Sequence, residues 1–168
     1  MALFFMLPYL RSGTKFGAPF VPMGKDVVAR VMKLGEVGPG KKFYDLGSGD
    51  GRLVIAAAML GAEAVGVEID AIRVLYSRLW LKVLGIKNAR IIKGNLFDQD
   101  LSSADIVSLY LLEETNEKLK PKLEEELKPG TPVVATGFPI PGWKPIKVDP
   151  HGPVYGPIYF YKKINSKH

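Results

Sequence analysis

A glycine-rich segment at residues 45–52 has the residue types and spacing of a ligand-binding loop. Its sequence is Asp-Leu-Gly-Ser-Gly-Asp-Gly-Arg, and it begins at the end of a short strand-like run, residues 42–46. Glycine lacks a side chain, so the backbone can turn tightly there and approach a ligand closely. In open α/β sheets, ligands bind beyond the carboxyl ends of the strands. We therefore predict a pocket lined by Asp45, Gly47, Ser48 and Gly49.

Two further segments that end strand-like runs carry side chains suited to a nucleoside. Glu68, followed by Ile69, ends the next run, where a carboxylate can accept hydrogen bonds from both ribose hydroxyls. Asn95 and Leu96 follow the third run and are placed to meet an adenine ring. Each feature alone has an ordinary explanation, such as a tight turn or a solvated acid. Together, at three successive strand ends, they favour a nucleoside ligand.

The acids beside the loop distinguish between the nucleoside cofactors. Dinucleotide sites use Gly-x-Gly-x-x-Gly, whereas the spacing here is Gly-x-Gly-x-Gly, and no Gly-Lys-Ser/Thr of a Walker loop occurs. Asp45 and Asp50 would repel a pyrophosphate, but they suit the sulfonium and ammonium of S-adenosylmethionine. We predict this cofactor. We expect no metal site, because the chain has two histidines and no cysteine.

Alternating helices and strands must position these residues. The apolar patterns predict helices at 26–34, 52–60, 70–84 and 113–127, and strands at 42–46, 64–69, 89–93, 105–110 and 132–136. Strands separated by helices indicate a parallel sheet with helices on both faces. The last strand-like runs, 146–148 and 154–163, have no helix between them, so we expect an antiparallel hairpin at one edge. The predicted fold is α/β, Rossmann-like, with seven mostly parallel strands.

Composition and length indicate in which compartment and with which partners the protein acts. The absence of cysteine fits a cytoplasmic protein, and no run approaches 18 uninterrupted apolar residues, so we expect no membrane partner. A length of 168 residues suits one domain, and we expect a monomer. The net charge of +6 permits a nucleic-acid partner, but the basic residues are scattered, as on an ordinary solvated surface.

Three segments of the sequence resemble a known family. Residues 45–52 and 65–70, and Phe-Pro-Ile-Pro-Gly-Trp at 138–143, are similar to the archaeal seven-strand protein lysine methyltransferases. They also resemble the mitochondrial enzymes that methylate the ATP synthase c-subunit and the adenine nucleotide translocase, which are similar in turn to the histone H3 lysine 79 methyltransferases. The resemblance extends over nearly the whole chain from Pro19 onward. It implies a class I methyltransferase fold and methyl transfer to the side-chain amine of protein lysines.

The resemblance also assigns roles to residues. It implies that Asp45, Gly47 and Gly49 line the methionine end of the cofactor, that Glu68 holds the ribose, and that Asn95 and Leu96 meet the adenine.

The resemblance further divides the chain into an N-terminal lid or substrate segment, 1–24, and a methyltransferase domain, 25–168. The segment from Pro19 to Met23, with Val21, would close over the cofactor. Related sequences often have serine or threonine where Met23 stands, and Met23 cannot supply that hydroxyl. We expect Tyr9 and Phe20 to belong to the lid; the alternative is a helix packed on the sheet.

Aromatic residues after the fourth and fifth predicted strands are candidates for the acceptor site. A lysine amine attacks only when neutral, which costs about 4–5 kcal/mol at pH 7 in water. Burial beside a sulfonium lowers its pKa, so no dedicated general base is required. We predict that Tyr110, Phe138 and Trp143 form a catalytic channel that holds the ammonium by cation–π attraction. Each of them has core packing as its alternative.

Two other functions stay open at this point. An RNA or DNA methyltransferase would suit the basic charge, but base-modifying enzymes usually carry Asn/Asp-Pro-Pro-Tyr/Phe after the fourth strand, and residues 108–112 are Ser-Leu-Tyr-Leu-Leu. The second alternative is a non-catalytic, chromatin-associated protein that binds S-adenosylmethionine. Because little sequence lies outside the predicted fold, we expect broad specificity for exposed lysines, including the protein's own. Small basic chromatin proteins are expected substrates by resemblance.

Overall fold

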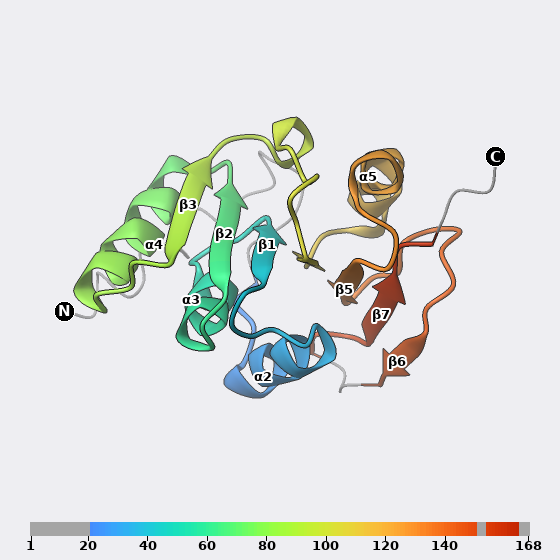
Figure 1. Cartoon of the computed structure of the whole chain (residues 1–168), viewed down its shortest axis with the longest axis horizontal. Helices are drawn as coiled ribbons and strands as arrows, with labels where there is room; N and C mark the ends of the chain where they lie inside the picture. The colour runs from blue at the N-terminus through green and yellow to red at the C-terminus, as the bar shows by residue number, and fades with distance from the viewer. Residues whose placement is uncertain (1–20, 151–153, 165–168) are drawn as a thin grey trace.

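The computed structural model describes residues 21–150 and 154–164. Within these residues the chain forms one seven-stranded sheet in the order β3-β2-β1-β4-β5-β7-β6 (Figure 1). Neighbours among the first five strands are parallel, whereas β7 is antiparallel to both β5 and β6. The predicted mixed sheet is confirmed, with β7 lying between β5 and the edge strand β6. The strands are β1 (Lys42–Leu46), β2 (Glu63–Glu68), β3 (Ala89–Lys93), β4 (Ile106–Leu109), β5 (Pro132–Thr136), β6 (Lys147–Asp149) and β7 (Ile158–Lys162).

The helices of the described residues follow the predicted alternation. They are α2 (Lys25–Leu34), α3 (Arg52–Met59), α4 (Ala71–Val83) and α5 (Glu113–Glu126), with a short 3-10 turn, η2 (Leu96–Asp98). The strand predicted at 154–163 starts later, at Ile158. Gly156 has a φ of 72°, which an extended strand does not allow, so the chain turns before β7 begins. No helix in these parts of the chain is both long and apolar enough to cross a lipid bilayer.

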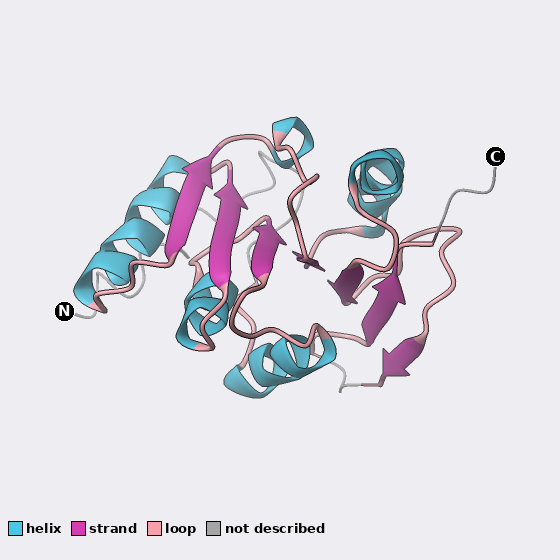
Figure 2. Cartoon of the chain, viewed as in Figure 1, coloured by secondary structure: helices cyan, strands magenta, loops and turns pink. Residues whose placement is uncertain are grey.

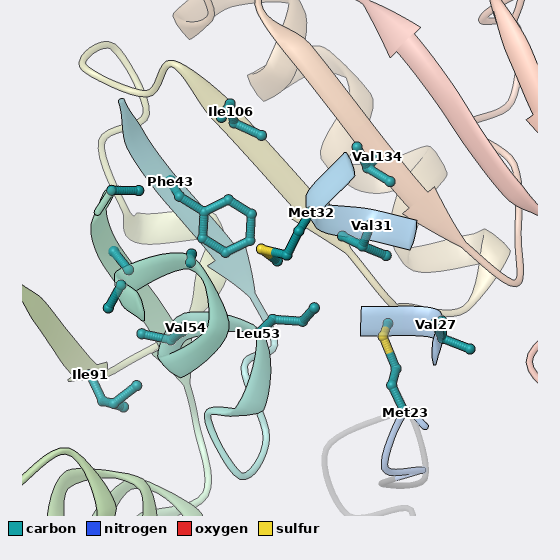
Figure 3. Packing of buried hydrophobic residues seen from close by; sticks show 14 of the residues in the cluster. Met23, Val27, Val31, Met32, Phe43, Leu53, Val54, Ile91, Ile106 and Val134 are labelled. Carbon is teal, nitrogen blue, oxygen red and sulfur yellow. The ribbon is translucent and has the colours of Figure 1, made fainter. Parts of the chain in front are cut away.

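The two faces of the sheet are covered differently. On one face, α2, α3 and α4 pack on the sheet through buried residues such as Val31, Val54 and Phe43 (Figure 3). On the other face, α5 packs through Leu119 and Leu123. Figure 2 shows the chain between β5 and β6 as a loop. The connections at 94–105 and 137–146 contain no α-helix, and they contribute the buried side chains Leu101 and Ile140 to this face.

The loop after β1 is held against the end of β2. The amides of Gly47 and Ser48 both donate to the Val67 carbonyl, at 2.9 Å each. Gly66 in β2 allows this approach, because a Cβ there would lie 2.7 Å from the Ser48 Oγ. Gly47, Gly49 and Gly51 have φ of 88°, 55° and 81°, in the left-handed region that glycine adopts without strain. The loop and the carboxyl end of β2 therefore form one fixed wall.

Candidate active site

A pocket of about 350 Å³ lies at the carboxyl ends of β1, β2 and β4. The structure brings to its wall every residue that the sequence predicted to contact a cofactor. These are Val21, Asp45, Gly47, Ser48, Gly49, Glu68, Ile69, Asn95 and Leu96. The predicted lid residues Tyr9 and Phe20 lie outside the described residues.

Glu68 is buried and its carboxylate is fixed by the backbone on both sides. Its Oε2 accepts a hydrogen bond from the Gly49 amide at 2.8 Å, and its Oε1 accepts one from the Asp70 amide at 2.8 Å. Arg73 lies close by, with its Nη1 3.9 Å from Oε1. A carboxylate oxygen can accept more than one hydrogen bond, so both oxygens can also accept from a ligand. This rigid pair of acceptors suits the two hydroxyls of a ribose.

Asp45 lies at the end of β1 and is almost fully buried. Burial, together with the nearby carboxylates of Asp50 and Glu68, raises the pKa of Asp45 from 3.8 to about 8, against an opposing contribution from the Ser108 hydroxyl. Arg52 and Arg73 also line the pocket, but Arg52 pairs with Asp50 and Arg73 lies beside Glu68. We therefore assign the binding of a cationic group of the ligand to Asp45. The positively charged S-adenosylmethionine fits these carboxylates, whereas a negatively charged pyrophosphate does not.

Several residues of the pocket wall were not assigned by sequence reasoning. Arg52 belongs to the glycine-rich segment itself, and this membership is the signal that could have identified it. Thr115 and Lys118 come from α5, where no local motif marks them. Phe97 lies in η2, next to the predicted adenine contacts. The residues in question are Arg52, Arg73, Phe97, Thr115 and Lys118.

The three predicted acceptor residues occupy different places. Tyr110 lines the cofactor pocket, and burial, followed by the neighbouring Tyr155, raises its pKa. Phe138 and Trp143 are not among the residues lining that pocket. Phe138 is 39% exposed just after β5. The Trp143 Nε1 donates to the Glu124 carboxylate of α5 at 2.8 Å. Only Tyr110 of the three is therefore next to the cofactor pocket.

The segment that carries Phe138 and Trp143 is held in place by hydrogen bonds to two other elements. The buried Asn116 of α5 donates through Nδ2 to the carbonyls of Phe138 and Pro139, at 3.2 and 3.1 Å. The Ile140 amide donates to the Tyr161 hydroxyl at 3.1 Å. The ring of Trp143 packs edge-on against that of Tyr161, with centroids 5.8 Å apart. These contacts fix the loop to α5 and β7.

The order of the sheet, the glycine loop and the acid at the end of β2 together define a class I methyltransferase. Residues 45–147 match the ANTKMT methyltransferase domain. The chain belongs to this family. It is 44% identical to a protein-lysine N-methyltransferase of Saccharolobus islandicus, over 85% of this chain and 92% of that protein. It is 36% identical to the human ATP synthase C-subunit lysine N-methyltransferase, over 88% of this chain but 62% of the human protein.

Solved structures agree on the fold and the cofactor. An RNA methyltransferase from Salinibacter ruber in complex with S-adenosyl-L-homocysteine is 40% identical, with a TM-score of 0.82 over 88% of this chain and 97% of that one. A SAM-dependent methyltransferase from Aquifex aeolicus, 17% identical with a TM-score of 0.67, shares the fold over 82% of this chain and 89% of its own. S-adenosylhomocysteine is what remains of S-adenosylmethionine after methyl transfer. The chain is thus an S-adenosylmethionine-dependent methyltransferase.

Proposed function

We propose that this enzyme methylates the side-chain amine of protein lysines. The observation that carries the proposal is the wall of the pocket after β4, where Tyr110 and Leu111 face the cofactor site. Base-modifying enzymes usually present Asn/Asp-Pro-Pro-Tyr/Phe at this point. An aromatic and an aliphatic side chain instead make a surface that favours a neutral amine. The names of the archaeal and mitochondrial relatives support the same acceptor.

In the proposed mechanism, bound S-adenosylmethionine supplies a methyl group activated by a cationic sulfur. Asp45 would hold the ammonium and Glu68 the ribose of this cofactor, and these contacts would orient the methyl group toward the acceptor. Tyr110 and Leu111 exclude water from the incoming lysine, which lowers its pKa and favours the neutral, nucleophilic form. The Tyr110 ring attracts the methylated ammonium that results. The proton that the amine loses passes to solvent.

We propose broad specificity, with lysine-rich segments as preferred acceptors. Glu113, Glu114 and Glu117 are exposed in the first turns of α5, the helix that contributes Thr115 and Lys118 to the pocket wall. These acids attract basic segments even though the whole chain carries a charge of +6. Small basic chromatin proteins and exposed lysines of the protein itself fit this description. The cysteine-free sequence also supports our proposal of a cytoplasmic enzyme. We further propose that it acts as a monomer.

Tyr110→Ala is expected to lower turnover of a lysine acceptor by about tenfold, because a cation–π contact and an apolar wall are lost. Tyr110→Phe keeps the ring and is expected to retain most of the activity. Steady-state kinetics, with the Kd of S-adenosylmethionine measured separately, would test this. Unchanged turnover in Tyr110→Ala would remove Tyr110 from the acceptor site.

Phe138 and Trp143 have different places in the proposal. We propose that Phe138, exposed beside α5, contacts the acceptor protein outside the pocket. The Trp143 Nε1 donates to the Glu124 carboxylate, so we propose that Trp143 supports the loop at 137–146 and does not touch the acceptor lysine. Trp143→Ala would then reduce the affinity for the acceptor by loosening the loop, and the affinity for cofactor would stay the same.

An RNA methyltransferase is the second candidate, favoured by the name of the Salinibacter relative and by the basic charge. Extract of the host, incubated with the enzyme and methyl-labelled S-adenosylmethionine, separates the two. We expect the label in macromolecules that protease digests and that nuclease leaves intact. Label removed by nuclease would replace our proposal with RNA methylation. Transfer that occurs only when the enzyme is added to the extract would discard the non-catalytic alternative.

A further inference from the structure

Arg52 occupies a place that helix stability does not explain. It is the first residue of α3, and the first turn of that helix contains no acid. The amino end of a helix carries partial positive charge, so a cation there is unfavourable. The Arg52 side chain is only about one-third exposed, and it lines the cofactor pocket. Its contacts with neighbouring residues supply the reason.

The Arg52 guanidinium joins the glycine loop to the segment before α2. Its Nε donates to the Asp50 carboxylate, 2.9 Å from Oδ1 and 3.1 Å from Oδ2, and its Nη2 donates to the same group. Its Nη1 donates to the main-chain carbonyl of Met23. Such a rigid fork orients both partners at once, which a lysine cannot do. Asp50 thus aims the guanidinium at Met23.

The segment that receives this hydrogen bond is itself part of the cofactor pocket. Val21, Pro22 and Met23 line one wall of it. The Met23 side chain is buried in the core, in the same cluster as Val27 and Leu53 (Figure 3). It therefore anchors the segment from the core side, while its carbonyl is held from the pocket side by Arg52.

We propose that Arg52 is a positioning residue that holds Val21–Met23 across the cofactor pocket and so slows the departure of the cofactor. Asp50 orients the guanidinium. In this arrangement the main chain of Met23 has a structural role that needs no side-chain hydroxyl at position 23. The proposal concerns the cofactor site alone and does not depend on which acceptor the enzyme uses.

A different role for Arg52 leads to the opposite expectation. If Arg52 served only to neutralise Asp50, its removal would leave an uncompensated carboxylate in the pocket. The cationic S-adenosylmethionine would then bind more tightly, and S-adenosylhomocysteine, which lacks the sulfonium charge, would gain less. Loss of the hydrogen bond from Arg52 to Met23 would instead weaken the binding of both ligands by the same factor. The ratio of the two affinities therefore separates the roles.

The test compares Arg52→Met and Arg52→Lys with the wild type. We expect Arg52→Met to raise the Kd of both S-adenosylmethionine and S-adenosylhomocysteine about tenfold, mostly through faster dissociation, with Arg52→Lys in between. Stopped-flow fluorescence and calorimetry measure these values. Hydrogen exchange should accelerate at the amides of residues 21–24, which contain one proline, and stay unchanged in α4 and β3.

Arg30→Met is the matched control. Arg30 also pairs with a carboxylate, its Nη1 lying 3.1 and 2.8 Å from the two carboxylate oxygens of Asp149, and it lies on α2 away from the pocket lining. We expect wild-type ligand affinities and wild-type exchange at residues 21–24. Tighter binding of S-adenosylmethionine alone in Arg52→Met, or unchanged exchange at 21–24, would overturn the proposal. Should Arg52→Met not fold, Arg52→Gln carries the same expectations.

Discussion

Asp45→Asn is expected to stabilise the cofactor-free protein at alkaline pH while weakening its binding of S-adenosylmethionine. Asp45 has a pKa of about 8 in the folded chain, against 3.8 as the ordinary value. The folded state therefore binds the Asp45 proton more tightly than the unfolded state does. The stability that this group contributes is complete below pH 4 and is lost as the pH rises through 8. Asparagine does not ionise and escapes that loss.

We expect a gain on the order of 3 kcal/mol in the free energy of unfolding at pH 9 and almost none near pH 4. Urea unfolding of both proteins at several pH values measures it. Asp98→Asn is the control: Asp98 is exposed in η2, and its replacement should change stability by less than about 0.5 kcal/mol at any pH. Equal stability of wild type and Asp45→Asn at pH 9 would show that Asp45 ionises without cost.

The same substitution should weaken cofactor binding by about 100-fold, because a charged hydrogen bond to the ammonium becomes a neutral one. The pKa of Asp45 adds a second signature. Near pH 7 the wild-type carboxyl is mostly protonated, so binding of a cation must release a proton. Calorimetry in buffers of different ionisation enthalpy detects this release. We expect it in the wild type and not in Asp45→Asn.

Glu68→Ala is expected to damage both stability and binding. Its carboxylate accepts from the buried amides of Gly49 and Asp70, and alanine leaves these donors without that partner. We expect a loss of about 3 kcal/mol in the free energy of unfolding and at least about 100-fold weaker binding of S-adenosylmethionine. Chemical unfolding and calorimetry measure the two effects.

Glu63→Ala is the control on the same strand. Glu63 begins β2, is exposed, and pairs at the surface with Arg90 at 3.0 Å. Its replacement should cost less than about 1 kcal/mol and leave cofactor binding as it was. A Glu68→Ala protein as stable as Glu63→Ala would mean that the amides of Gly49 and Asp70 find other acceptors. The substitutions Asp45→Asn and Glu68→Ala are thus expected to change stability in opposite directions, while both weaken the binding of S-adenosylmethionine.

The sequence was informative about the sheet because its signals are local. Apolar runs and glycines between residues 42 and 136 set most element bounds to within two residues. The shorter β7 depends on Gly156, whose left-handed φ is a property of the folded turn and not of its apolar neighbours. The unequal cover of the two faces depends on the connections at 94–105 and 137–146, whose periodicity predicted no helix but did not show what they cover.

The cofactor residues were predictable for a geometric reason. Parallel strands place their carboxyl ends along one edge, so residues that follow successive strands must meet there. No comparable geometric rule predicts side-chain contacts between segments that are distant in the sequence. The bond from Arg52 to the Met23 carbonyl joins residues 29 positions apart. The orientation of Trp143 depends on Glu124, on a different element. An aromatic residue between prolines resembles a substrate contact until its partner is known.

The loop between β5 and β6, on the face of the sheet where α5 packs, has a consequence for how such an enzyme can diversify. At 137–146 the chain runs from β5 toward β6 without a helix, on the side that carries Phe138 and the exposed acids of α5. Surface connections accept added residues at little thermodynamic cost, since the closure entropy of a loop grows slowly with its length. New segments inserted there would lie beside Phe138, where we propose that the acceptor protein binds, without disturbing the strands beneath. Selectivity for a particular protein can therefore evolve by lengthening this connection, while the cofactor pocket is inherited unchanged.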